Sequence, residues 1–377
     1  MLTSCKHTLP SGPPDTVKCD TCHTDTTHCD TCHTDTTHHP CDTCNQHVNP
    51  WDTTSHNFTW TEMSIGSESS LRGVFVSSPT SIFCSGNDIY HYDGSAWTKT
   101  TFMINAVRQL GYVGDFTMFG FADTDFWMVG GSIIEHCINY ANGSGKALDY
   151  RLTDLGIFHT GDGALHAAWG TSSNDMFFVG DYGTIFHFDG SHWEDMPKVT
   201  SKNLQSVWGT SHNDVWACGY KQSTGETAIV HYDGSSWTNI DPSVVGANIQ
   251  AHGDGLSGTW ACDSSGHTKI YMCGAFLYRK TDNGSWINDS ATIGNQLGVN
   301  SYAALFNIRG NSSNDIMVQG SSGFIAHWNG KSWQAYSNLF GWSNAFYDTP
   351  GMSFKTNTAC MVGWKNGSGY VAIGQRH

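Results

Sequence analysis

Two Cys-x-x-Cys-His pentapeptides near the start of the chain carry the side chains best suited to chemistry. The sequence CDTCHTDTTH occurs twice in direct succession, over residues 19–38. In each copy two thiols precede an imidazole, the pattern that attaches a haem covalently and ligates its iron. The side chains concerned are Cys19, Cys22, His23, Cys29, Cys32 and His33. We therefore expect two haem c groups in this part of the chain.

An imperfect third copy follows directly. Cys41 and Cys44 repeat the spacing, but Asn45 stands where the ligating histidine is expected. His47 is the nearest imidazole that could replace it. A third haem c at Cys41 and Cys44 is therefore left open.

The segment that carries these motifs has almost no apolar side chains. Between Asp15 and Val48 the only aliphatic residues are Val17 and Val48 itself. Such a segment cannot bury enough apolar surface to offset the entropy lost on ordering. We expect residues 1–50 to form a Cys/His-rich arm with little secondary structure, which only a bound group such as haem organises.

Over residues 19–44 the motifs resemble those of multihaem c-type cytochromes, including cytochromes that form extracellular electron-conducting filaments. The resemblance implies that His23 and His33 are proximal ligands of two bis-histidine haems. Two histidines per iron leave no open position, which favours electron transfer over substrate chemistry. The candidates for the remaining axial positions are His28 and His38, followed by His39, His47, His7 and His56.

The spacing of His28 indicates ligation between chains. His28 lies five residues beyond His23, a reach of at most roughly 17 Å. It would have to pass around the edge of the macrocycle to bind the opposite face of the same haem. We therefore expect His28 and His38 to ligate a neighbouring haem or the haem of another copy, so that the arm forms a homo-oligomer or filament with the rest of the protein outside.

Two other interpretations of the arm remain open. Paired Cys-x-x-Cys motifs also form structural zinc sites, and Cys29 and Cys32 with Cys41 and Cys44 provide such a set. A tail held together by disulfides is the third interpretation. Neither explains why a histidine follows each of the first two cysteine pairs.

From about residue 57 the chain becomes a repeat. A histidine, an aromatic residue, Asp or Asn, and Gly precede a tryptophan by two residues, in HYDGSAW, HFDGSHW, HYDGSSW and HWNGKSW. A second signature precedes three of these motifs, as WGTSSNDMFFVG, WGTSHNDVWACG and RGNSSNDIMVQG. A period of 40 to 50 residues with several short strands is typical of propeller blades, and Asp-Gly is a hairpin turn signal.

Counting the repeats predicts an all-β, seven-bladed propeller over residues 51–377. The expected blades cover 71–103, 116–155, 164–198, 204–241, 249–290, 302–337 and 344–377. The last blade lacks its outer strand, and residues 57–63 supply one, which closes the ring and removes the exposed edges. These repeats resemble the seven-bladed propellers of secreted bacterial proteins.

Charge and composition exclude several classes of partner. The 377 residues include 33 acidic and 18 basic side chains, a net charge of −15. This argues against nucleic acid and against an anionic membrane surface, and no apolar run approaches the ~18 residues that span a bilayer. Covalent haem attachment favours a secreted or cell-surface protein. We interpret the missing signal peptide as a part of the precursor that the numbering omits.

No arrangement of residues in the repeats indicates an enzyme. The recurring His91, His187, His231 and His327 are expected to make structural hydrogen bonds, and the recurring tryptophans to pack between blades. The predicted function is an extracellular or cell-surface c-type cytochrome that passes electrons to redox partners through the arm. The alternative is a non-redox surface propeller that binds a protein or glycan, with a zinc- or disulfide-ordered tail.

Overall fold

The computed structural model describes most of the expected propeller. The residues described are 53–65, 71–105, 107–110, 116–241, 255–264, 266–281, 284–289, 293, 304–336, 351–365 and 367–377. The chain divides between His47 and Val48. The arm, with all of its predicted haem ligands, lies outside the described residues.

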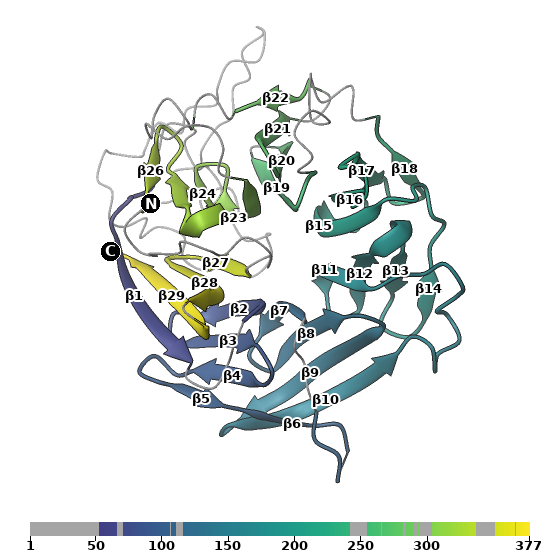
Figure 1. Cartoon of the computed structure of the whole chain (residues 1–377), viewed down its shortest axis with the longest axis horizontal. Helices are drawn as coiled ribbons and strands as arrows, with labels where there is room; N and C mark the ends of the chain where they lie inside the picture. Colours follow the sequence, from purple (N-terminus) through teal and green to yellow (C-terminus); the bar gives the residue numbers. More distant parts are fainter. Residues whose placement is uncertain are drawn as a thin grey trace, which may run out of the picture. The chain divides into compact units, whose positions relative to one another are not determined.

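The described strands form seven sheets that are arranged as blades around a central channel (Figure 1). This confirms the predicted all-β, seven-bladed propeller. Within a blade the first strand lies innermost and the later strands follow outward, each antiparallel to the one before.

The bounds of the strands follow the chain. Blade 1 holds β2 (Gly73–Ser78), β3 (Ser81–Ser85), β4 (Ile89–Tyr92) and β5 (Trp97–Lys99). Blade 2 holds β6 (Thr101–Met103), β7 (Thr117–Ala122), β8 (Asp125–Gly130), β9 (Ile133–Ala141) and β10 (Ser144–Arg151). Blade 3 holds β11 (Leu165–Ser172), β12 (Asp175–Gly180), β13 (Ile185–Phe188) and β14 (Trp193–Asp195). Blade 4 holds β15 (Asn203–Ser211), β16 (Asp214–Tyr220), β17 (Thr227–Tyr232) and β18 (Trp237–Asn239).

Blade 5 holds β19 (Gly258–Ser264), β20 (His267–Cys273), β21 (Leu277–Thr281) and β22 (Ile287–Asn288). Blade 6 holds β23 (Leu305–Ser312), β24 (Asp315–Gly320), β25 (Ile325–Trp328) and β26 (Trp333–Ala335). Blade 7 holds β27 (Met352–Lys355), β28 (Thr358–Lys365), β29 (Ser368–Arg376) and β1 (Phe58–Ile65). Two helical turns, η1 (Asp181–Gly183) and η3 (Ser321–Gly323), join the second and third strands of blades 3 and 6.

Blade 7 is closed by the start of the propeller sequence, as predicted. Strand β1 pairs antiparallel with β29, from Phe58 opposite Arg376 to Ile65 opposite Gly369. Phe58 is buried against blades 6 and 7, where its ring lies 5.3 Å from His327 and 6.1 Å from Phe354. The last blade therefore needs residues from both ends of the propeller sequence to be complete.

Blade 2 departs from the prediction at its outer edge. Residues 101–103, expected in blade 1, form β6 and pair parallel with β10 of blade 2. Blade 2 lacks the Asp-Gly turn and tryptophan of the other blades, and its β9 and β10 form a long hairpin instead. The buried ring of Phe102 packs beside Gly145 on β10, where a Cβ would lie 2.5 Å from the ring. A neighbouring segment thus covers the edge of the longer hairpin.

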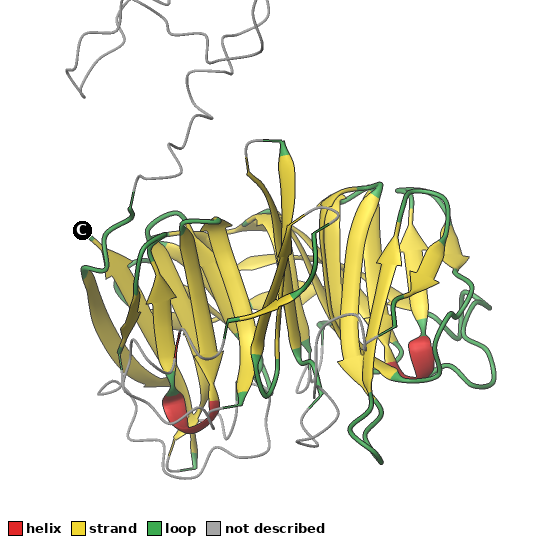
Figure 2. Cartoon of the chain, turned by 90° about the horizontal axis from the view of Figure 1, so that it is seen from above, coloured by secondary structure: helices red, strands yellow, loops and turns green. Residues whose placement is uncertain are grey.

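The turns divide the propeller into two faces. The turns between first and second strands and between third and fourth strands lie on one face, here called the turn face. The opposite face, here called the loop face, carries the links between blades and the helical turns η1 and η3, which are red at the lower edge of Figure 2. On the turn face the Oδ1 of Asp93 accepts hydrogen bonds from the amides of Ser95 and Ala96 at 2.8 Å, and Gly94 has φ of 94°. The hairpin turn predicted from Asp-Gly is confirmed at this site.

The recurring histidines make the expected structural hydrogen bonds. In blades 3, 4 and 6 the histidine Nε2 lies 2.8–2.9 Å from the first aspartate of the second strand, in the pairs His187–Asp175, His231–Asp214 and His327–Asp315. Blade 2 has a matching pair, His136–Asp125, that the motif did not predict. The Asn-Asp signature and the histidine motif are therefore two halves of one repeated contact.

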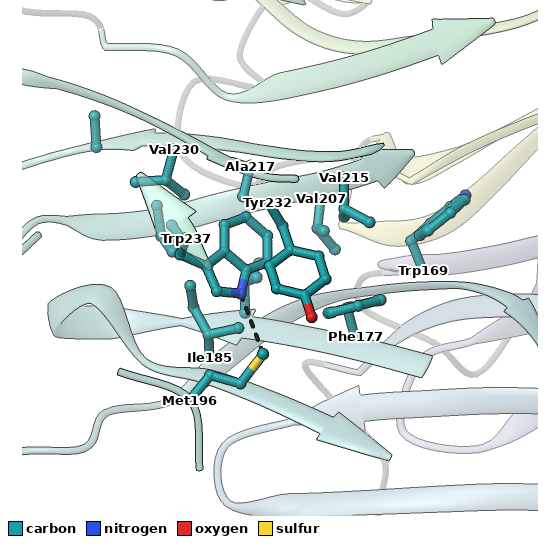
Figure 3. Packing of buried hydrophobic residues seen from close by; sticks show 13 residues of the cluster. Trp169, Phe177, Ile185, Met196, Val207, Val215, Ala217, Val230, Tyr232 and Trp237 are labelled. Carbon is teal, nitrogen blue, oxygen red and sulfur yellow. Dashed lines mark hydrogen bonds between the residues drawn. The ribbon is translucent and has the colours of Figure 1, made fainter. Parts of the chain in front are cut away.

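The core is divided among the junctions between blades. Figure 3 shows the junction of blades 3 and 4, where the indole Nε1 of Trp237 lies 3.1 Å from the Met196 sulfur. A Cβ on Gly209 would lie 2.6 Å from the ring of Trp169 in the preceding blade. The glycine of the Trp-Gly signature is thus required because a tryptophan of the neighbouring blade occupies the space of a side chain.

The described part of the chain contains no helix long and apolar enough to cross a membrane.

Candidate binding site in the central channel

The innermost strands enclose a pocket of about 340 Å³, here called the channel pocket. Every blade contributes to its lining, mostly with residues from the beginning of the first strand. Because these strands begin at the loop face, the pocket lies toward that end of the channel. Its polar side chains include Arg72, Thr117, His166, Gln205, Ser206, Asn307 and Arg309.

The lining of the channel pocket has the opposite charge balance from the whole chain. It contains two arginines and one histidine but neither aspartate nor glutamate, whereas the chain has 33 acidic and 18 basic residues. A concave site lined by cations concentrates the local field and attracts anions. The pocket is therefore a candidate site for a negatively charged group.

Arg309 is the best-placed cation in this lining. Its Nη1 donates to the carbonyl oxygens of Ile308 at 2.7 Å and Thr259 at 3.3 Å, and its guanidinium carbon lies 4.8 Å from the centre of the Trp208 ring. Burial lowers the pKa of Arg309 to about 10. Among the described residues no carboxylate lies within salt-bridge distance of Arg309, so its Nε and Nη2 donors have no acidic partner there.

Aromatic side chains hold Arg309 from across the channel. Trp208 comes from β15 of blade 4, and its ring meets that of Phe119 on β7 of blade 2 edge to face, at 5.8 Å. Arg309 on β23 of blade 6 lies over the same indole. Three alternate blades thus meet next to the channel pocket, and a guanidinium stacked on an indole has little freedom to move.

The loop-face rim of the pocket is held by His166. Its Nε2 lies 2.7 Å from Asp181 Oδ1, at the start of η1, and its carbonyl accepts from Thr117 Oγ1 at 3.0 Å. The next residue, Tyr182, is 58% exposed although its φ of 56° lies in the left-handed region. An exposed aromatic ring held in a costly backbone conformation is a feature of binding surfaces.

The predicted haem ligands and thiols, from His7 to His47, lie outside the described residues, so the structure neither joins nor separates them. The six cysteines after residue 50 are free thiols, and five of them are buried. The prediction of predominantly buried thiols in the body of the chain is thus confirmed. Burial raises the pKa of Cys262, the partly exposed one, to about 12, which keeps it protonated and unreactive.

The sequence analysis missed the channel pocket, although one signal for it was present. Arg309 stands where Trp169 and Trp208 stand in the repeated signature. A cation in place of a packing aromatic residue is an exception that the repeat itself makes visible. Arg72 and Gln205 carried no such signal, because only the closed ring brings them together.

The sequence matches no protein-family model and no curated protein. Solved structures match it in fold. YCF48 bound to D1 peptide has a TM-score of 0.58 at 12% identity, over 86% of this chain and 98% of that one. YCF48 from Cyanidioschyzon merolae has a TM-score of 0.54 at 13% identity, over 84% and 98%. The WD40 β-propeller domain of Doa1 has a TM-score of 0.56 at 12% identity, over 86% and 98%.

The chain contains a seven-bladed, WD40-like β-propeller. At these identities the similarity establishes the fold alone, since one fold hosts many functions.

Proposed function

We propose that the propeller is a non-enzymatic binding module that holds a protein partner at the loop face and takes a carboxylate of that partner into the channel pocket. Arg309 carries this proposal: it is a half-buried cation without an acidic partner among the described residues, in a lining free of carboxylates. Arginine binds carboxylates through two parallel hydrogen bonds, and its remaining donors are Nε and Nη2.

Fold and pocket size both support a protein partner. WD40-like propellers are typically protein-interaction scaffolds, and one of the matching solved structures is described as bound to a peptide. A volume of about 340 Å³ is at the lower end of the range for small-molecule sites. It suits the end of a peptide, one carboxylate with the side chain beside it, better than a large cofactor.

Peptide binding tests this proposal. We would measure the affinity of the full chain for a peptide library in which each member is made with a free and with an amidated C-terminus, and with acidic or amide side chains. Arg309→Gln is expected to weaken binding of the carboxylate peptides at least tenfold, about 1.4 kcal/mol. Arg108→Gln is the matched control, because Arg108 pairs with Asp149 far from the channel.

Arg309 also stacks on Trp208, so Arg72→Gln serves as a second pocket variant, and thermal melting checks the fold of both. Binding that is equal for the free and amidated peptides would refute carboxylate recognition. So would unchanged affinity in both pocket variants.

The tandem motifs of the arm favour a second function. We propose that Cys19, Cys22, Cys29 and Cys32 bind two haem c groups and that the chain carries electrons at a cell surface or outside the cell. The support is the repeated Cys-x-x-Cys-His pattern of residues 19–38. A haem stain on a denaturing gel tests it, because thioether-linked haem stays with the chain. The double change Cys19→Ala and Cys22→Ala should remove half of the stain, whereas zinc without a Soret band would contradict it.

A further inference from the structure

The junction of blades 3 and 4 brings two imidazoles and a carboxylate together on the turn face. Asp175 begins β12 and His187 lies on β13 of the same blade, whereas His212 comes from the turn between β15 and β16 of the next blade. His187 Nε2 and His212 Nδ1 each lie 2.8 Å from the same oxygen, Asp175 Oδ1. The candidate ligand atoms all lie within 4.8 Å of one another.

This junction differs chemically from the others that have the same plan. At the preceding junction a hydroxyl, Ser173 Oγ, approaches Asp125, and at the following one Thr268 Oγ1 lies 3.3 Å from Asp214. At the last, Arg376 binds Asp315. In the described part of the propeller, Asp175 alone receives a second imidazole at this position. A contact that elsewhere only joins blades has here gained a metal-ligating side chain.

We propose that Asp175, His187 and His212 bind a divalent transition metal ion, in the first place Zn²⁺, with water as the fourth ligand. Two imidazoles and one carboxylate form a donor set that zinc accepts in tetrahedral geometry. Bond lengths of about 2.0–2.1 Å place tetrahedral ligand atoms roughly 3.3 Å apart. The two nitrogen–oxygen distances of 2.8 Å therefore have to widen by only about half an ångström.

The surroundings of the three ligands suit a metal ion. Thr171 Oγ1 donates to the other carboxylate oxygen of Asp175 at 2.5 Å, which fixes the orientation of that group. The ring of Phe177 lies 4.4 Å from that of His187 and limits its rotation. The His212 side chain is 44% exposed, which gives the ion and its water a path from solvent.

The proton balance of binding is simple. When the imidazoles are neutral, each N–H that faces the carboxylate moves to the other ring nitrogen of the same residue, and the freed lone pair binds the ion. No proton is released in that case. An imidazolium would instead release one proton to solvent as the ion binds.

A second cluster of similar composition does not support a site. His159, Asp162 and Asp195 also lie within ligand distance of one another. There the Lys198 ammonium lies 2.5 Å from Asp162 Oδ1 and already neutralises that carboxylate. No competing cation is paired with Asp175 among the described residues.

Zinc titration of the full chain tests the proposal, with the substitution His212→Ser. Serine restores the residue found at Ser173, so the contact between blades is kept and only the ligand is lost. His192→Ser is the matched control, since His192 lies in the same pair of blades but pairs with Asp189 in an exposed turn. Zinc should raise the melting temperature of the propeller in the wild type and the control, and affinity should fall at least tenfold in His212→Ser.

Because the arm also offers thiols and imidazoles to zinc, the ion must be located as well as counted. Anomalous diffraction at the zinc edge from crystals of the full chain should show a peak about 2.0–2.2 Å from the three ligand atoms. A crystal soaked with zinc that lacks this peak would overturn the proposal. An equal melting shift in wild type and His212→Ser would do the same, because it would assign the stabilisation to another site.

Discussion

Glu135 on β9 is a buried carboxyl group with an unusual environment. Its side chain is 2% exposed, and Oε2 has no hydrogen-bond partner among the described residues. Burial and, to a smaller extent, the charge of Asp149 raise the pKa of Glu135 to about 8. The group is therefore protonated in the folded protein at neutral pH and ionised in the unfolded chain.

This difference predicts a pH-dependent stability. The stabilisation from protonated Glu135 is fully present below pH 4.5, its ordinary pKa, and is lost as the pH rises to about 8. The amide in Glu135→Gln does not ionise. We expect the variant to be about 1–3 kcal/mol more stable than the wild type at pH 9 and nearly equal at pH 4.

Urea denaturation at both pH values measures this difference, with the exposed Glu194→Gln as the control. A constant difference between variant and wild type across this range would show that Glu135 does not titrate as described.

At the scale of elements, the closing strand β1 makes the clearest prediction. Removal of residues 1–52 leaves β1 in place, so the melting temperature should stay within a few degrees of that of the full chain. Removal of residues 1–65 exposes the edge of β29 and uncovers Phe354 and His327, which Phe58 contacts. An open, apolar edge pairs with other chains, so this shorter chain should aggregate.

Calorimetry and light scattering distinguish the two truncated chains. Similar melting and similar scattering would mean that β1 is not needed to close the ring.

The elements also show what a sequence can predict. The number of blades and the closing strand followed from local patterns: the repeat period, the Asp-Gly turns and a missing tryptophan strand. The position of β6 did not, because residues 101–103 join blade 2 only when the long hairpin of β9 and β10 leaves an edge to cover. The channel pocket was also missed, since its lining comes from seven blades that are far apart in the sequence. Only Arg309 marked it, as an exception to a repeat.

At the scale of the whole molecule, the proposed haem arm would join copies while the propellers remain outside. In that arrangement His28 and His38 complete haems of neighbouring arms. We predict that His28→Ala combined with His38→Ala dissociates the assembly and leaves the melting of the propeller unchanged. Sedimentation velocity gives the assembly state, and the Soret band shows whether the haems remain attached.

The propeller variant His192→Ala is the control, because it removes an exposed imidazole without touching the arm. A wild-type chain that is monomeric, with each haem ligated wholly within its own chain, would contradict this arrangement.

The seam between β1 and β29 also gives the propeller a direction of mechanical strength. Strand β1 begins at the turn face, and its eight residues each face a partner on β29. A pull on the chain before Thr53, directed away from that face, runs along the strand and loads the whole ladder at once, in shear. A sideways pull instead opens the ladder one pair at a time from Phe58. The ring should therefore withstand axial tension on its arm far better than lateral tension.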